Sequence, residues 1–82
     1  MTTAPRIEPH LIVKNSREWL RLSVEAYKGR ILFNGRIWYT PTAGAELRPG
    51  RDGWAMPIDQ LPEIVAALQQ LELEARQAGL LP

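Results

Sequence analysis

The feature that most constrains the fold is a pair of alternating segments joined by two turn residues. From Trp19 to Ala26, apolar and polar side chains alternate with period two, as in a strand with one buried face. Lys28 and Gly29 follow as a two-residue turn, since glycine adopts a positive φ without strain. A second β-rich segment runs from Arg30 to Thr40 and ends before Pro41. The sequence therefore predicts an antiparallel hairpin.

The two-residue turn also fixes the register of this hairpin. It places Tyr27 opposite Arg30 and Arg21 opposite Arg36. One face then carries only apolar side chains, which are Leu20, Leu22, Val24, Ile31, Phe33 and Ile37. The other face carries mainly aromatic and basic side chains, which are Trp19, Arg21, Tyr27, Arg30, Asn34, Arg36 and Trp38. A shift of one residue would mix the two sets, so the pattern itself supports this register.

Two further short strands and a helix are expected after the hairpin. Glu46–Arg48 and Trp54–Met56 are the predicted strands, with Pro49–Gly53 as the turn between them. Asp59 is the predicted N-cap of a helix that Gly79 stops. The predicted fold is therefore α+β: a four-stranded antiparallel sheet over residues 19–57 and one C-terminal helix over residues 59–78.

The predicted helix has most of its apolar residues on one stripe, which is able to cover one face of the sheet. Leu73 falls off that stripe and widens the apolar surface toward a second subunit. Because one helix cannot cover both faces, the aromatic and basic face is expected to stay open.

Composition indicates a single small domain that needs further stabilisation. A chain of 82 residues buries only roughly 60% of its unfolded surface. Cysteine is absent, so neither a disulfide nor a thiolate metal site can stabilise the fold. Good packing or a partner subunit must therefore supply the stability that so small a core lacks.

Charge is distributed unevenly along the chain. The overall net charge is +1, but residues 19–54 carry +3 and residues 55–82 carry −3. A basic middle indicates a surface that faces a polyanion, and an acidic end indicates a solvated or partner-facing helix.

The N-terminal segment gives little structural signal. Residues 1–15 are expected to form a flexible arm, in which residues 11–13 form either a short edge strand or a lid on the core. The first ten residues show no charged-then-apolar signal pattern, and the longest apolar run is too short to cross a bilayer. We therefore expect a soluble cytoplasmic protein with no membrane partner.

Three segments of the chain resemble a known protein family. They are L-S-V-E-A-Y-K-G-R (Leu22–Arg30), I-L-F-N-G-R-I-W-Y (Ile31–Tyr39) and G-A-E-L-R-P-G-R-D-G-W-A-M-P (Gly44–Pro57). In this order and spacing they resemble the single-stranded-DNA-binding core of the transcriptional coactivator positive cofactor four. The serine-rich tail of the animal proteins is not seen, so the chain looks more like the compact bacterial or viral members. The resemblance implies a curved sheet, a homodimer and a binding groove shared by two subunits.

The resemblance also implies which residues bind the nucleic acid. Carried over by position, they are Tyr27, Lys28, Arg30, Arg36, Trp38, Tyr39, Arg48 and Arg51. Arg21 joins them because it lies opposite Arg36, where two like charges are unfavourable unless an anion sits between them. Trp38 and Tyr39 point to opposite faces of a regular strand; Trp38 is the preferred ligand-facing residue, and a bulge would exchange the two.

The residues favour binding over catalysis. No set of nucleophile, base and orienting group can be assembled, and no metal ligands cluster around the single histidine, His10. We expect no enzymatic activity, no cofactor and no metal. The leading hypothesis is a homodimer that binds single-stranded DNA, or also RNA, with little sequence preference, and that supports the transcription, replication or repair machinery. The alternative is a protein-interaction module that docks a polypeptide through its helix or its aromatic sheet face.

Overall fold

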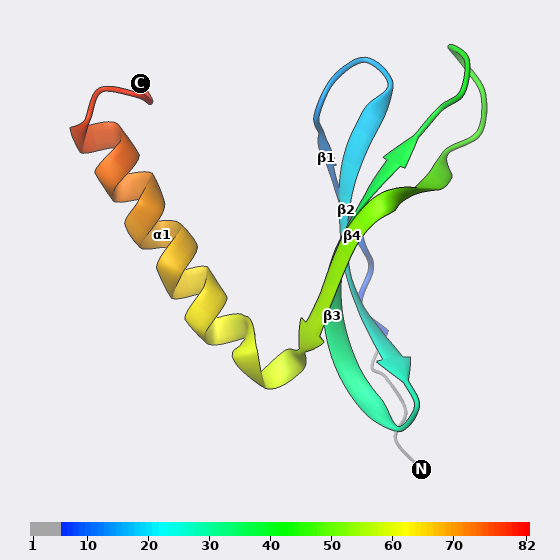
Figure 1. The fold of residues 1–82 in the computed structure, drawn as a ribbon, viewed down its shortest axis with the longest axis horizontal. Coiled ribbons are helices and arrows are strands. Elements are labelled where there is room, and N and C mark those ends of the chain that lie inside the picture. Colours follow the sequence, from blue (N-terminus) through cyan, green and yellow to red (C-terminus); the bar gives the residue numbers. More distant parts are fainter. Residues whose placement is uncertain (1–5) are drawn as a thin grey trace.

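Four antiparallel strands followed by one helix make up the fold (Figure 1). The computed structural model describes residues 6–82. The strands lie in sequence order across the sheet and are β1 (His10–Val13), β2 (Glu18–Tyr27), β3 (Arg30–Tyr39) and β4 (Arg48–Pro57). A 3₁₀ turn, η1 (Ile58–Gln60), leads into α1 (Leu61–Gln77). The predicted class, a four-stranded antiparallel sheet with one C-terminal helix, is confirmed.

The central hairpin of β2 and β3 has the predicted turn and register. Lys28 and Gly29 have φ values of 50° and 76°, the left-handed conformation that a two-residue turn of this kind requires. Tyr27 lies opposite Arg30, and the pairing continues without a shift to the far end of both strands. Each strand therefore presents one set of side chains to each face.

The apolar face of the sheet contains the small core of the single chain. Phe33 is the one buried hydrophobic residue in the part of the chain that the structure describes, with 5% of its surface exposed. The Trp54 ring on β4 meets Phe33 edge to face, with the ring centroids 5.4 Å apart. Gly35 lies opposite Trp54, and a Cβ atom built there would come within 2.7 Å of the indole. Glycine is therefore needed at position 35 for the ring to lie against the sheet.

β1 adds a strand outside the predicted sheet boundaries. It pairs with β2 along all four of its residues, so the sheet begins at residue 10 and not at residue 19. Of the two alternatives for residues 11–13, the structure shows the edge strand. The predicted arm is wrong for these residues, because they pair with the free edge of β2. An apolar run of three residues is too short to show this pairing by its periodicity. Residues 1–5 of the predicted arm lie outside the described residues.

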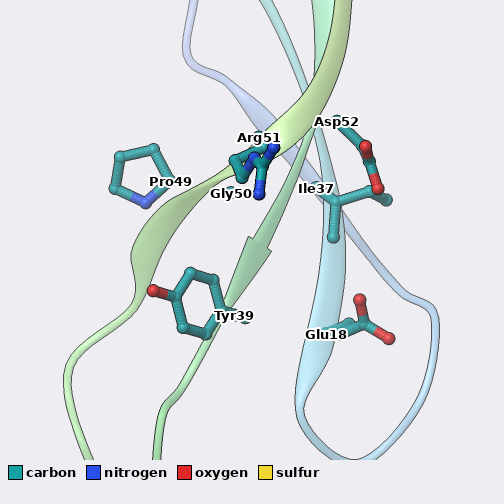
Figure 2. Close-up of a pocket in the computed structure, with 7 residues that line it drawn as sticks. All are labelled: Glu18, Ile37, Tyr39, Pro49, Gly50, Arg51 and Asp52. Carbon is teal, nitrogen blue, oxygen red and sulfur yellow. The ribbon is translucent and has the colours of Figure 1, made fainter.

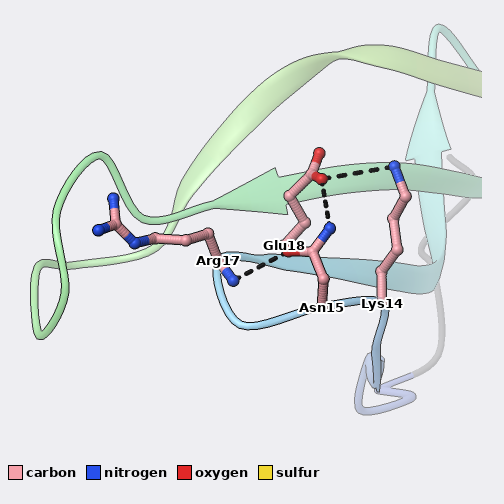
Figure 3. Close-up of polar contacts among 4 residues, drawn as sticks. All are labelled: Lys14, Asn15, Arg17 and Glu18. Atoms are coloured by element: carbon pink, nitrogen blue, oxygen red, sulfur yellow. Dashed lines mark hydrogen bonds and ion pairs between the residues drawn. The ribbon is translucent and has the colours of Figure 1, made fainter.

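The turn between β1 and β2 is organised by Asn15 (Figure 3). Its side-chain oxygen accepts a hydrogen bond from the backbone N–H of Arg17 at 2.9 Å, and its amide donates to Glu18 Oε1 at 2.7 Å. Lys14 Nζ lies 3.5 Å from the same carboxylate oxygen. The Asn15 hydrogen bond, followed by the charge of Lys14, lowers the pKa of Glu18 in spite of some desolvation.

β4 is one continuous strand, which corrects the sequence prediction. Pro49–Gly53, the predicted turn between two short strands, lies inside β4, and its two end residues pair with Trp38 and Arg36 of β3. The pairing shifts so that Gly50, Arg51 and Asp52 together face Ile37 alone. This is a bulge, and it uses the same glycine-rich and proline-rich sequence as a turn. Gly50 allows it, because a Cβ atom there would lie 2.6 Å from the carbonyl oxygen of Ile37.

The ends of α1 agree only partly with the prediction. At the C-terminus, Gly79 has a φ of 78°, and the N–H groups of Gly79 and Leu80 bond to the carbonyls of Arg76 and Ala75. This is the Schellman arrangement that a terminal glycine favours. At the N-terminus, Asp59 is not the N-cap: it lies in η1, and Gln60 occupies the cap position without a side-chain hydrogen bond.

The helix does not cover the sheet within one chain, and this expectation is wrong. α1 extends away from the end of β4 (Figure 1), and none of its residues is buried. Its apolar stripe is open to solvent, with Leu68 59% exposed and Leu71 62% exposed. The helix begins immediately after the η1 turn at the edge of the sheet, and this short connection directs it outward.

Candidate nucleic-acid interface

A groove of about 390 Å³ lies on the polar face of the sheet. This polar-face groove is lined by residues of β2, β3 and β4, which are Arg21, Glu25, Tyr27, Leu32, Asn34, Arg36, Trp38, Pro49, Trp54 and Ala55. Four of the predicted binding residues line it: Arg21, Tyr27, Arg36 and Trp38. The predicted alternation therefore brings the aromatic and basic side chains of the hairpin together on one surface.

Arg21 and Arg36 are the two cations among the residues that line the groove. The Arg21 guanidinium carbon lies 5.0 Å from the centre of the Trp38 ring, and its Nη1 lies 3.6 Å from Glu25 Oε1. Arg36 Nη1 donates to the carbonyl oxygen of Gly50 in the β4 bulge at 3.0 Å. Each guanidinium has five N–H donors, so these contacts leave most of its donors available to a phosphate.

Tyr27 marks the end of the groove at the hairpin turn. Its side chain is 59% exposed, and Lys28 Nζ lies 5.4 Å from its ring centre. Arg30 lies opposite Tyr27 in the register. An exposed ring beside two cations is suited to stacking on a base while the adjacent phosphates are neutralised.

The structure separates Trp38 from Tyr39. Trp38 lies on the polar face, as the alternation predicts, and it is half-buried beneath Arg21. Its indole Nε1 is buried, and no group of residues 6–82 accepts a hydrogen bond from it. A desolvated donor without a partner is unfavourable for the stability of the free protein.

Tyr39 and Arg51 lie outside the polar-face groove. Both line a separate pocket of about 450 Å³, together with Glu18, Ile37 and Asp52 (Figure 2). Arg51 belongs to the three-residue bulge, so its direction cannot be obtained by continuing the strand alternation. Arg48 lies opposite Tyr39 at the start of β4 and is exposed. The nine predicted residues therefore fall on more than one surface.

Three polar residues of the groove region were not predicted as site residues. Glu25 and Asn34 line the groove, and Ser23 is buried beside it with 8% of its surface exposed. The Ser23 hydroxyl donates to Asn34 Oδ1 at 3.0 Å and lies 3.3 Å from Glu25 Oε1. The signal that could have found all three residues is the hairpin register, which places them on the same face as Arg21.

Solved structures show which known fold this arrangement matches. No family model matches the sequence, and no curated protein matches it by sequence. A PC4 homologue from Burkholderia pseudomallei superimposes with a TM-score of 0.69 over 77% of this chain and 84% of its own, at 19% identity. The chain has the PC4 fold. PC4 is positive cofactor four, so the resemblance drawn from the sequence segments is confirmed at the level of the fold.

Two other structures with the PC4 fold are similar to a comparable extent. One is the bacteriophage T5 homologue of the eukaryotic transcription coactivator PC4, with a TM-score of 0.67, 20% identity, and coverage of 84% of this chain and 80% of its own. The other is MoSub1 in complex with DNA, with a TM-score of 0.60, 22% identity, and coverage of 87% and 86%.

The opposite face of this PC4 fold carries a second, apolar groove. It has a volume of about 510 Å³ and extends from the sheet to the first turns of α1. Its apolar lining includes Ile12, Leu20, Leu22, Val24, Phe33, Trp54, Leu61, Ile64, Val65 and Leu68. Two surfaces of opposite chemistry thus lie on the two faces of one sheet.

Residues 6–82 contain no group of three or more His, Asp or Glu side chains placed to hold a metal ion. None of the helices over the same residues is long and apolar enough to cross a membrane.

Proposed function

We propose that this chain binds single-stranded DNA as a homodimer, with little sequence preference and without catalytic activity. The observation that carries the proposal is the polar-face groove, in which the Arg21 guanidinium lies over the Trp38 ring and Arg36 lines the same surface. Lys28, Arg30 and Tyr27 extend the same chemistry to the hairpin turn. Rings stack on bases of any sequence and cations neutralise phosphates, which is how sequence-tolerant single-strand binders work.

The comparisons support DNA as the ligand. The MoSub1 structure with the same fold is a complex with DNA. The phage T5 homologue is implicated in recombination-dependent DNA replication. We extend these properties to this chain as part of the proposal, with a role in transcription, replication or repair, a cytoplasmic location near nucleic acid, and RNA as a second ligand.

The homodimer is proposed because a single chain leaves its apolar groove and the apolar stripe of α1 exposed to solvent. Among the described residues, Phe33 is the one buried hydrophobic side chain, although an apolar groove and an apolar helix stripe lie nearby. Within one chain, α1 points away from the sheet and leaves the apolar groove uncovered. In the proposed homodimer, α1 of the second copy covers this groove. This arrangement supplies the core that a chain of 82 residues lacks.

Titration of tryptophan fluorescence with a mixed-sequence single strand tests DNA binding. We expect quenching that reverses with salt, with a log–log slope of roughly −0.7 for each phosphate neutralised. The matched duplex serves as the specificity control. No quenching at low salt would contradict the proposal and favour the protein-interaction module.

Charge reversal tests the location of the site. Arg30→Glu with Arg36→Glu is expected to abolish strand binding and to leave the mass of the dimer in solution unchanged. Arg17→Glu with Arg76→Glu changes the net charge by the same amount at exposed positions outside the groove and is expected to retain most of the binding. Equal losses in the two double variants would show that the groove is not the binding site.

A further inference from the structure

A cluster of oxygen acceptors lies in the middle of the polar face. Ser23 on β2 faces Asn34 on β3, and Glu25 follows two residues later on the same face. The Ser23 hydroxyl is 3.0 Å from Asn34 Oδ1 and 3.3 Å from Glu25 Oε1. We call these three residues the acceptor cluster.

The Ser23 hydroxyl cannot satisfy both of its neighbouring acceptors at once. A serine hydroxyl carries one proton, so it satisfies either Asn34 Oδ1 or Glu25 Oε1 at a given moment, but not both. Arg21 Nη1 lies 3.6 Å from the Glu25 carboxylate, which holds this negative group at the groove. An N–H donor from a ligand is therefore favourable beside the Glu25 carboxylate, whereas a ligand oxygen that faces this carboxylate is repelled.

The cluster lies where a base would reach it. At roughly 3.3 Å per residue along a strand, Ser23 is about 13 Å from Tyr27 in one direction and from Trp19 in the other. Trp19 lies opposite Trp38. A strand of DNA that stacks on rings at both ends of the groove has to pass over the cluster, so its intervening bases present their edges there.

We propose that the acceptor cluster reads one base of the bound strand and favours cytosine over uracil or thymine. The exocyclic N4 amino group of cytosine donates to a carboxylate, whereas uracil and thymine place the O4 acceptor at the same point. This inference rests on the proposed function and refines it: most of the affinity is independent of sequence, and one position carries a preference. One such contact should make the affinity for a strand with cytosine at this position roughly fivefold or more higher than that for a strand with uracil or thymine.

The test compares oligo-dC with oligo-dU of the same length, at one salt concentration and at pH 8. These strands differ in the amino or carbonyl group at C4 and in the protonation of N3, and neither carries the thymine methyl group. We expect oligo-dC to bind about fivefold more tightly than oligo-dU to the native chain. Glu25→Gln is expected to bring the ratio to within about twofold, and the control Glu46→Gln, which changes the same charge outside the groove, is expected to leave it unchanged.

Each outcome bears on a different claim. Equal binding of the two strands, or a ratio that survives Glu25→Gln, would overturn the base preference while leaving salt-dependent binding of single strands intact. If neither strand binds, the proposed function fails and the base preference fails with it. Because the readout is a ratio between two ligands, a general change in affinity or folding in the variant does not imitate the expected result.

Discussion

Arg21 and Arg36 lie directly opposite each other on β2 and β3, but their guanidinium groups have different partners. Arg21 lies over the Trp38 ring at 5.0 Å, and Arg36 donates to the Gly50 carbonyl at 3.0 Å. Like charges opposite each other destabilise a sheet, and an anion between them relieves that repulsion. A phosphate bound between these two residues would therefore reduce the repulsion across the hairpin.

Arg36→Gln should weaken binding and make it less dependent on salt. The substitution removes one phosphate contact, so the log–log slope against salt should become shallower by roughly 0.7. Arg76→Gln on α1 removes a cation outside the groove, where it pairs with Glu72, and is the matched control. An unchanged slope for Arg36→Gln, measured by anisotropy of a labelled strand, would exclude this residue as a phosphate contact.

Trp38→Leu should reduce affinity for single strands much more than Tyr39→Leu. The Trp38 ring lies in the polar-face groove, whereas Tyr39 lies in a separate pocket behind the strand. Loss of one stacking ring is worth about 1–3 kcal/mol of binding free energy. The measurement is anisotropy of a labelled strand, with circular dichroism to confirm that both variants are folded. A larger loss in Tyr39→Leu would place the ligand on the other face.

Gly35→Ala should lower the stability of the fold. A Cβ atom at this position lies 2.7 Å from the Trp54 indole and 3.2 Å from Leu22, so the ring must move. Overpacking of this kind decreases the free energy of unfolding by about 1–3 kcal/mol. In a Trp54→Leu background the same substitution should be less harmful, and a denaturation double-mutant cycle measures the coupling. Equal losses in both backgrounds would show that the ring is not the cause.

Leu68→Glu with Leu71→Glu should convert the proposed homodimer to monomers. Both side chains are exposed in the single chain and lie on the apolar stripe of α1. Placing two charges in a buried interface is unfavourable because they lose hydration without gaining partners. Gln70→Glu, on the opposite side of the helix, is the control and should remain dimeric. Sedimentation equilibrium gives the masses, and a double variant of dimer mass would rule out this face as the interface.

Asn15→Ala should raise the pKa of Glu18 toward the ordinary value of a glutamate. The Asn15 hydrogen bond is the largest cause of the lowered pKa. A lowered folded-state pKa means that ionised Glu18 stabilises the fold above its unfolded pKa, and that this contribution is lost as the pH falls through the folded value. The acid dependence of stability should therefore be weaker in Asn15→Ala. An NMR titration of the Glu18 carboxyl group, with Ser16→Ala as control, checks the shift.

The hairpin could be predicted because its determinants are local. Period-two alternation and the Lys28–Gly29 turn are sufficient to set the register, and the register is sufficient to place Arg21, Arg36 and Trp38 on one face. The polar-face groove follows from these same few residues. Ser23 and Glu25 also follow from the register, but their significance depends on hydrogen bonds that only the folded chain reveals.

The remaining features depend on long-range pairing. The sequence Pro49–Gly53 is equally suitable for a turn and for a bulge, and the pairing with Ile37 decides between them. That bulge in turn places Arg51 with Tyr39 in a separate pocket. The direction of α1 was not predictable, because an amphipathic stripe indicates that a helix is covered but does not indicate by which chain.

The uncovered stripe of α1 has a consequence for experiments at low concentration. If a second copy completes the core, folding and association form a single equilibrium, and the melting temperature should rise with protein concentration. Diluting the sample would then unfold the chain as well as separate the subunits. The affinity for a ligand would also depend on the protein concentration used in the assay, so titrations are comparable only at matched concentrations.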